Sequence, residues 1–132
     1  MYQKIFNFFA AAIGISVNYA FGGWSESLSF LGMLVIADYV TGISAAIKEG
    51  TGLNSNTGFW GICKKAFMFL VIAILHRADI LIGTDVLMIG AIYFYIANEL
   101  VSIIENLGRL NFPLPPQLKQ IVGVLKSKGE QR

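Results

Sequence analysis

Four long apolar segments set the limits on what this chain can fold into. They cover residues 5–21, 28–47, 66–85 and 86–104. A helix needs roughly 20 mostly apolar residues to cross the hydrocarbon core of a bilayer, and each segment is close to that length. A soluble helical bundle would carry a polar stripe along every helix, whereas only 14% of these 132 residues are charged and 55% are apolar. The sequence therefore predicts an all-α membrane protein with four transmembrane helices.

Composition excludes several other classes of protein. A chain this apolar is not disordered, and a single cysteine excludes a small disulfide-bonded domain. The net charge of +2 gives no support for nucleic-acid binding. One His and one Cys offer no nucleophile–base pair, and His76 with Asp79 supplies too few ligands for a metal. We therefore expect a protein that is not an enzyme and that needs no cofactor.

The positive charges predict a single orientation in the membrane. Nine of the ten Lys and Arg residues lie before the first segment, in the link 48–65 or in the tail 109–132, and the two other links contain none. By the positive-inside rule, both termini and the link 48–65, which we interpret as a turn-rich loop, are expected in the cytoplasm. The bases expected at lipid headgroups are Lys48, Lys64, Lys65, Lys119, Lys126 and Lys128.

The first segment is open to three interpretations. It is long enough to span, but Lys4 and the apolar run up to Gly22 also resemble a signal peptide. Cleavage there would leave three spans. The segment is also mildly amphipathic, which suits a helix that lies in the membrane interface. Its small and polar face carries Asn7, Ala11, Gly14 and Asn18.

The tail differs in character from the rest of the chain. We expect residues 1–108 to form the transmembrane domain and residues 109–132 to form a basic cytoplasmic tail, because the Pro-rich stretch 112–116 cannot continue a helix. Apolar residues then recur with helical spacing from Leu118 to Leu125. This pattern predicts a short amphipathic helix on the cytoplasmic leaflet. A disordered basic tail is the alternative.

Ionisable residues inside the spans need partners, because each costs roughly 2.5–3.5 kcal/mol at the centre of a membrane helix. At about 1.5 Å per residue, Asp38 lies ~15 Å and Arg77 ~12 Å from the outer edge. These depths predict an ion pair between the second and third helices. Asp79 points to a different face from Arg77. Glu99 has no base at its own depth, so we expect it to be protonated or exposed to water.

Polar residues in the spans are the candidate pore or gating residues. They are Asp38, Thr41, Arg77, Asp79, Asn98, Glu99 and Ser102. Two pairs of small residues at i, i+4 spacing, Gly42 with Ala46 and Ala10 with Gly14, predict close helix packing. Packing is the expected role of Thr41 as well.

The order of several short motifs carries a family resemblance. In sequence these are DYVTG at 38–42, AAIKEG at 45–50, GFWGICKK at 58–65, a late Asp79 and the Pro-rich stretch 112–116. This order resembles the bacteriophage holin family, which includes the toxin-secretion holins of clostridia, over about residues 28–128. The resemblance implies a small phage-encoded protein of the bacterial cytoplasmic membrane. Such a protein forms homo-oligomers in the lipid bilayer and opens lesions that release an endolysin or a toxin.

Four helices are too few to enclose a large pore, so we expect any hole to form between copies. Asp38, Arg77 and Glu99 are expected to pair until a trigger, such as loss of the membrane potential, admits water. The alternative function is a small oligomeric four-helix transporter or ion channel. Nine bases on one side and none on the other argue against the dual orientation found in some small transporters.

Overall fold

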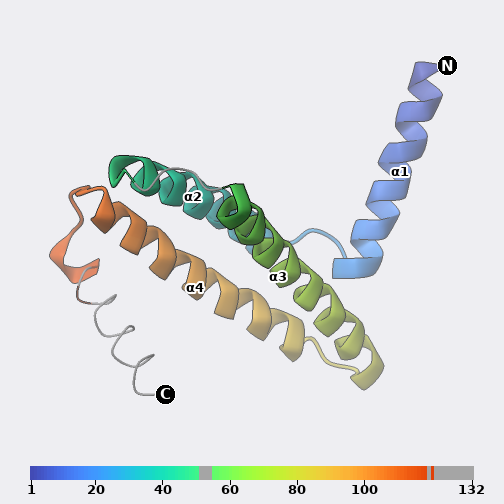
Figure 1. Ribbon diagram of the computed structural model, residues 1–132. Coiled ribbons are helices and arrows are strands. Elements are labelled where there is room, and N and C mark those ends of the chain that lie inside the picture. Colours follow the sequence, from blue (N-terminus) through green and yellow to red (C-terminus); the bar gives the residue numbers. More distant parts are fainter. Residues whose placement is uncertain (51–54, 119, 121–132) are drawn as a thin grey trace.

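The protein folds as four helices joined by short connections (Figure 1). They are α1 (Tyr2–Phe21), α2 (Glu26–Lys48), α3 (Ser55–Ile82) and α4 (Val86–Arg109). The structure, a computed structural model, describes residues 1–50, 55–118 and 120. All four helices are long and apolar enough to cross a membrane. The prediction of an all-α protein with four potential spans is confirmed.

Helix α4 packs against both α2 and α3, whereas α1 splays away from these three (Figure 1). The core lies between the three packed helices and consists of Leu28, Leu31, Leu34, Ile72, Ile92 and Ile96. Outside the core, many Phe, Ile, Leu and Val side chains are exposed. A soluble monomer rarely exposes such a surface, but lipid covers it without cost. The chain is a multi-pass membrane protein.

Local sequence explains where several helices begin and end. Ser25 caps α2, since its hydroxyl oxygen accepts a hydrogen bond from the Leu28 amide at 3.3 Å. Glu26 in the first turn and Lys48 in the last turn of α2 favour its dipole. Helix α1 ends at Phe21, because the next residue, Gly22, has a left-handed φ of 70° that a residue with a side chain rarely adopts.

The predicted loop at 48–65 is wrong over most of its length. Helix α3 begins at Ser55 rather than at residue 66, so Lys64 and Lys65 belong to a helix. Glycines and the run of Asn and Ser at the start of α3 are typical of turns, but glycine is common in membrane helices. At the other end α3 stops at Ile82, because Gly83 turns the chain with a φ of 75°. Helix α4 continues past residue 104 to Arg109.

The chain after α4 turns at Asn111, which has a φ of 57°, and enters the Pro-rich stretch. Residues 116–118 are helical, in keeping with the preference of proline for a first helical turn. Most of the predicted amphipathic helix, with Lys119, Lys126 and Lys128, lies outside the described residues. The division into a membrane domain and a tail stays a prediction.

Candidate functional site

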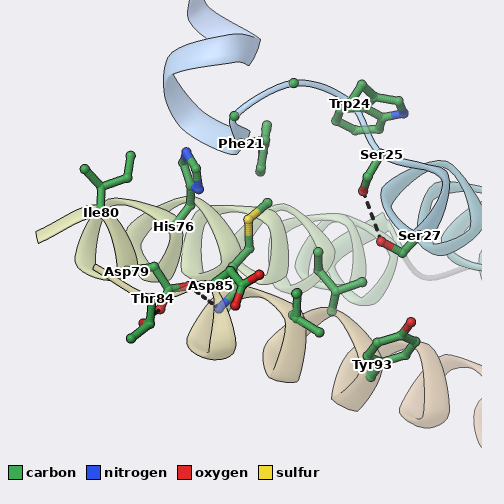
Figure 2. A pocket seen from close by; sticks show the side chains of 15 residues that line it. Phe21, Trp24, Ser25, Ser27, His76, Asp79, Ile80, Thr84, Asp85 and Tyr93 are labelled. Carbon is green, nitrogen blue, oxygen red and sulfur yellow. Dashed lines mark hydrogen bonds between the residues drawn. The ribbon is translucent and has the colours of Figure 1, made fainter. Parts of the chain in front are cut away.

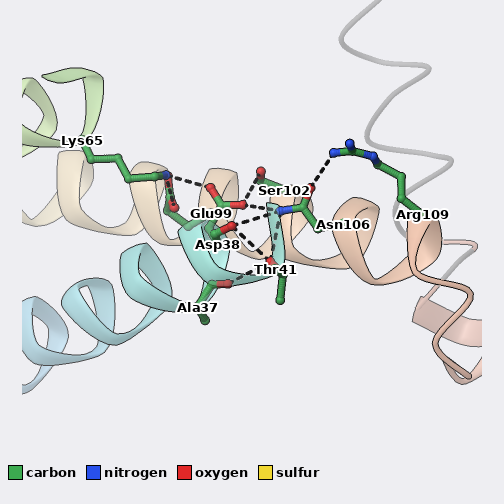
Figure 3. Close-up of polar contacts among 8 residues, drawn as sticks. All are labelled: Ala37, Asp38, Thr41, Lys65, Glu99, Ser102, Asn106 and Arg109. Atoms are coloured by element: carbon green, nitrogen blue, oxygen red, sulfur yellow. Dashed lines mark hydrogen bonds and ion pairs between the residues drawn. The ribbon is translucent and has the colours of Figure 1, made fainter. Parts of the chain in front are cut away.

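A lysine joins the three packed helices (Figure 3). The Nζ atom of Lys65 in α3 lies 2.7 Å from Oδ2 of Asp38 in α2. The same nitrogen lies 2.8 Å and 3.1 Å from the two carboxylate oxygens of Glu99 in α4. The exposed fraction of these side chains is 18% for Lys65, 10% for Asp38 and 6% for Glu99. Two carboxylates thus share one ammonium group in a nearly closed space.

The position of each group along its helix explains this meeting. Asp38, Lys65 and Glu99 each lie about ten residues, or ~15 Å, from the helix end on the predicted cytoplasmic side. The long side chain of Lys65 extends from α3 toward α2 and α4, where it meets the two carboxylates (Figure 3). A charge at this depth is costly unless it has a partner, and here Lys65 is the shared partner of both carboxylates.

Hydroxyl and amide groups complete the arrangement around Asp38. Ser102 donates a hydrogen bond to Oδ1 of Asp38 at 2.6 Å, and the amide of Asn106 donates to the same oxygen at 2.9 Å. The Asn106 amide also contacts the hydroxyl of Thr41 at 3.1 Å, and that hydroxyl donates to the carbonyl of Ala37 at 2.8 Å. We call Asp38, Thr41, Lys65, Glu99, Ser102 and Asn106 the Lys65 cluster. Across the described residues, no buried side-chain nitrogen or oxygen atom lacks a hydrogen-bond partner.

The predicted ion pair between Asp38 and Arg77 is wrong. Arg77 lies about twelve residues, or ~18 Å, further along α3 than Lys65. Its guanidinium carbon sits 3.9 Å from the centre of the Tyr19 ring, a cation–π contact with α1. The expectation that Glu99 has no base at its depth is also wrong, because Lys65 supplies one. Both errors follow from placing the start of α3 too late.

Asp79 has a structural role at the turn between α3 and α4. It is 2% exposed, and its carboxylate accepts hydrogen bonds from the backbone amides of Leu87 at 3.1 Å and Met88 at 2.8 Å. The Thr84 hydroxyl donates to it at 2.7 Å. Asp79 therefore caps the first turn of α4 from the preceding helix. Asp85 stands at the N-cap position itself, but its side chain makes no capping bond.

The remaining predicted residues divide between the interior and the surface. A Cβ added at Gly42 would lie 3.5 Å from the Asn106 amide nitrogen, so Gly42 packs closely against α4. Asn98 is exposed on α4. Gly14 has open space around it, and Ala10 is exposed like the rest of that part of α1. Among the predicted headgroup bases, Lys64 is exposed, whereas Lys48 donates to the carbonyl of Leu110 at 2.9 Å.

An exposed ion pair joins α2 and α4 at the end nearest the tail. The guanidinium of Arg109 contacts the carboxylate of Glu49 at 2.9 Å and 3.0 Å. This contact holds the pKa of Glu49 below its ordinary value. The contribution of the pair is therefore present at neutral pH and is lost only as the pH falls through the lowered pKa. Because both side chains are about 40% exposed, salt screens the pair.

A pocket of 580 Å³ opens at the other end of the helices (Figure 2). It lies between the α1–α2 connection and the facing ends of α3 and α4. Phe21, Trp24 and Tyr93 give it aromatic walls, and His76 and Asp85 add polar groups at its edge. Amphipathic aromatic residues of this kind are typical of the boundary between membrane and water.

A comparison of the sequence with known families identifies the family of this chain. The bacteriophage holin family matches residues 15–127 of the chain. The protein belongs to this family. The match includes the whole of α2, α3 and α4 and therefore every residue of the Lys65 cluster.

Individual relatives of this holin-family protein cover nearly its whole length. An uncharacterized protein of Halalkalibacterium halodurans is 41% identical over 94% of this chain and 96% of its own length. An uncharacterized protein of Clostridium perfringens is 34% identical over 89% of each chain. A probable holin of Bacillus phage phi105 is 30% identical over 92% of this chain and 89% of its own. No solved structure matches the chain.

Sequence reasoning about this holin-family protein missed two members of the Lys65 cluster. The sequence predicts Lys65 at lipid headgroups and assigns no role to Asn106. The available signal was the helical spacing of Glu99, Ser102 and Asn106, which places all three on one side of α4. A polar stripe of that length predicts a partner with charge on a neighbouring helix.

Proposed function

We propose that this protein is a holin. Copies assemble in the bacterial cytoplasmic membrane, with both termini in the cytoplasm, and open lesions through which an endolysin or a toxin leaves the cell. The observation that carries this proposal is the match of residues 15–127 to the bacteriophage holin family. The relative from phage phi105, a probable holin, supports the same function.

The packing of a single copy supports a hole that forms between copies. Core residues such as Leu31, Ile72 and Ile96 fill the space between α2, α3 and α4, and the Lys65 cluster satisfies its own polar groups. The described part of one copy therefore offers no path for water through its centre. A lesion wide enough for a folded enzyme needs many copies.

In this proposal, the Lys65 cluster stabilises the closed form of the protein. It ties α2, α3 and α4 together through one ammonium group. If both carboxylates are ionised, the cluster has one uncompensated negative charge, which water would solvate better than the packed interior does. A charge within the membrane also responds to the potential, by about 2.3 kcal/mol per 100 mV for a full crossing. Loss of the potential is therefore a suitable trigger.

Controlled expression tests the proposed function. The protein is induced in a bacterium whose cytoplasm contains a muralytic enzyme that has no export signal. A holin stops growth abruptly and releases the enzyme, so the culture lyses, and without the enzyme growth stops but the cell walls stay intact. Leakage of ions with full retention of the enzyme would instead indicate a small channel. Continued growth at full membrane expression would refute the proposal.

Neutralising either carboxylate of the cluster is expected to change the time of lysis. Asp38→Asn and Glu99→Gln each remove the excess negative charge while keeping the side-chain shape, so both change the balance between closed and open forms. Lys64→Met is the matched control, because Lys64 is exposed beside the cluster lysine. Optical density after induction gives the lysis time at equal membrane levels. If cells with each of the two variants lyse at the same time as cells with the wild-type protein, the cluster does not control the closed form.

A further inference from the structure

One face of α1 is built for contact with another helix. It carries only small and polar side chains, and all of them are exposed: Asn7, Ala10, Ala11, Gly14 and Asn18. The opposite face carries bulky apolar side chains, among them Phe6, Phe9 and Ile13, which are 60–71% exposed. In a bilayer, bulky side chains suit lipid, whereas small residues and asparagine mark helix–helix interfaces. The small face of α1 therefore needs a helix to cover it.

The rest of the same chain does not supply that helix. Helix α1 contacts α3 only near its own last turn, through Tyr19 on Arg77 and Phe21 on Phe69. From there α1 points away from α2, α3 and α4 (Figure 1). Among the described residues, the amides of Asn7 and Asn18 have no hydrogen-bond partner. An unpaired amide in hydrocarbon is costly.

The exposed side of α4 presents a matching surface. Asn98 lies there among lipid-facing residues, and no described residue hydrogen-bonds its amide. Gly90, with open space around it, and Ala97 allow a second helix to come close. Asn98 lies ~18 Å from the outer end of α4, and Asn7 lies ~21 Å from the outer end of α1. The two unpaired amides are thus at nearly the same depth, and each has both donors and an acceptor.

We propose that α1 of one copy packs on the exposed face of α4 in a second copy, with Asn7 hydrogen-bonded to Asn98 of the partner subunit. The two helices run in opposite directions. In this register Ala11 lies opposite Phe94 of the partner subunit and Gly14 lies close to Gly90 of the partner subunit. An aromatic ring on one helix thus meets a small residue on the other.

This interface joins different surfaces of two identical chains. Such head-to-tail contacts form rings if they close and continue to add copies if they do not. Each copy binds one neighbour through its α1 and another through the exposed face of its α4, so this interface does not fix the number of copies in the assembly. The inference rests on the proposed assembly of copies and specifies how they join.

Disulfide formation between two differently tagged chains tests this interface. Both chains carry Cys63→Ser, because Cys63 is the protein's single cysteine. One chain adds Asn7→Cys and the other adds Asn98→Cys, and isolated membranes are oxidised. Because a disulfide needs Cβ atoms about 4 Å apart, we expect about fivefold more heterodimer than with Phe9→Cys and Asn98→Cys, the matched control pair. A second pair, Ala11→Cys with Phe94→Cys, is expected to form heterodimer as well.

Several outcomes would overturn the interface. Equal heterodimer in the test and control pairs would show that the contact is not specific. Dimers of the Asn7→Cys chain with itself would show that α1 pairs with α1. If an amine-reactive crosslinker captures oligomers while neither cysteine pair reacts, this interface is wrong but assembly of copies stands. If neither method captures oligomers at full membrane levels, the assembly in the proposed function fails too.

Discussion

Lys64 and Lys65 are neighbours in the sequence but lie in opposite environments. Lys64 is exposed, and an ammonium there reaches headgroups and water. Lys65 points between the helices, where Asp38 and Glu99 compensate its charge. A buried ion cluster adds little to stability relative to an apolar replacement, but it becomes strongly destabilising when one partner is removed.

Lys65→Met is therefore expected to destabilise the protein by about 3 kcal/mol. This is the lower end of the range for broken buried pairs, because 18% of the Lys65 side chain is exposed. Lys64→Met is the control and is expected to have almost no effect. Thermal unfolding of the detergent-solubilised protein measures the difference.

Removing all three charges tests whether the fold needs the charges themselves or only needs to have no unpaired ion. The variant Asp38→Asn, Lys65→Met, Glu99→Gln has no unpaired ion, so its unfolding temperature is expected to return most of the way to wild type. A triple variant no more stable than Lys65→Met would contradict this account of the cluster.

Asp79→Ala is expected to lower the unfolding temperature clearly, whereas Asp85→Ala is not. Asp79 accepts two backbone hydrogen bonds from the first turn of α4. Asp85 lies at the N-cap position without a capping bond. Both variants remove one carboxylate near the same turn, so a simple charge effect would shift them equally, and equal shifts would exclude the capping role.

At the scale of elements, the connection between α1 and α2 determines the direction of α1 relative to α3. Gly22 and Gly23 both have positive φ, at 70° and 112°. A Cβ added at Gly22 would lie 2.7 Å from the His76 ring. The chain needs glycine at this point for both its conformation and its contact with α3.

Gly22→Ala is expected to loosen α1 from α3, at a cost of roughly 1–2 kcal/mol from the left-handed conformation alone. Gly61→Ala is the control, because Gly61 lies in α3 with nothing within 4 Å of an added Cβ. Trp24 stacks near Phe69, so its fluorescence reports the contact in a Trp60→Phe background. Emission is expected to shift to longer wavelength in Gly22→Ala and not in Gly61→Ala. An unchanged spectrum in both would count against a tight fit at Gly22.

The length of α3 explains how a charged residue reaches the cluster from the cytoplasmic side. With 28 residues it measures ~42 Å, whereas the hydrocarbon core is about 30 Å thick. The helix must therefore tilt or extend beyond the core. Consecutive residues of a helix point about 100° apart, so Lys65 faces α2 and α4 while Lys64 stays exposed.

At the scale of the whole molecule, the distribution of Lys and Arg predicts which ends face the cytoplasm. In a Cys63→Ser background, Ser25→Cys is expected to react with a membrane-impermeant thiol reagent in intact cells. Gln117→Cys, just before the basic tail, is expected to react only after the cells are opened. The reverse labelling pattern would show that the orientation is inverted.

Labelling of a third position, Gln3→Cys, shows whether α1 spans the membrane or lies along its outer surface. If α1 spans the membrane, this thiol is protected in intact cells, like the thiol at residue 117. If α1 lies along the outer surface, the reagent reaches it directly. The second result would also overturn the contact between Asn7 and Asn98 of the partner subunit, since the two amides would no longer share a depth.

The sequence alone was enough to predict four apolar helices and a membrane setting, because length and hydropathy are local properties of each segment. It also singled out Asp38 and Glu99, since a carboxylate in an apolar helix requires a partner wherever it lies. Only the tertiary structure determines which residue is that partner. Lys65 meets both carboxylates, and Arg77 does not, because α3 begins at Ser55. That start lies in a stretch rich in Gly, Asn and Ser, which is typical of turns. Local sequence does not reveal that the stretch is helical, because the contact it makes, Gly58 near Tyr39 of α2, exists only in the folded chain.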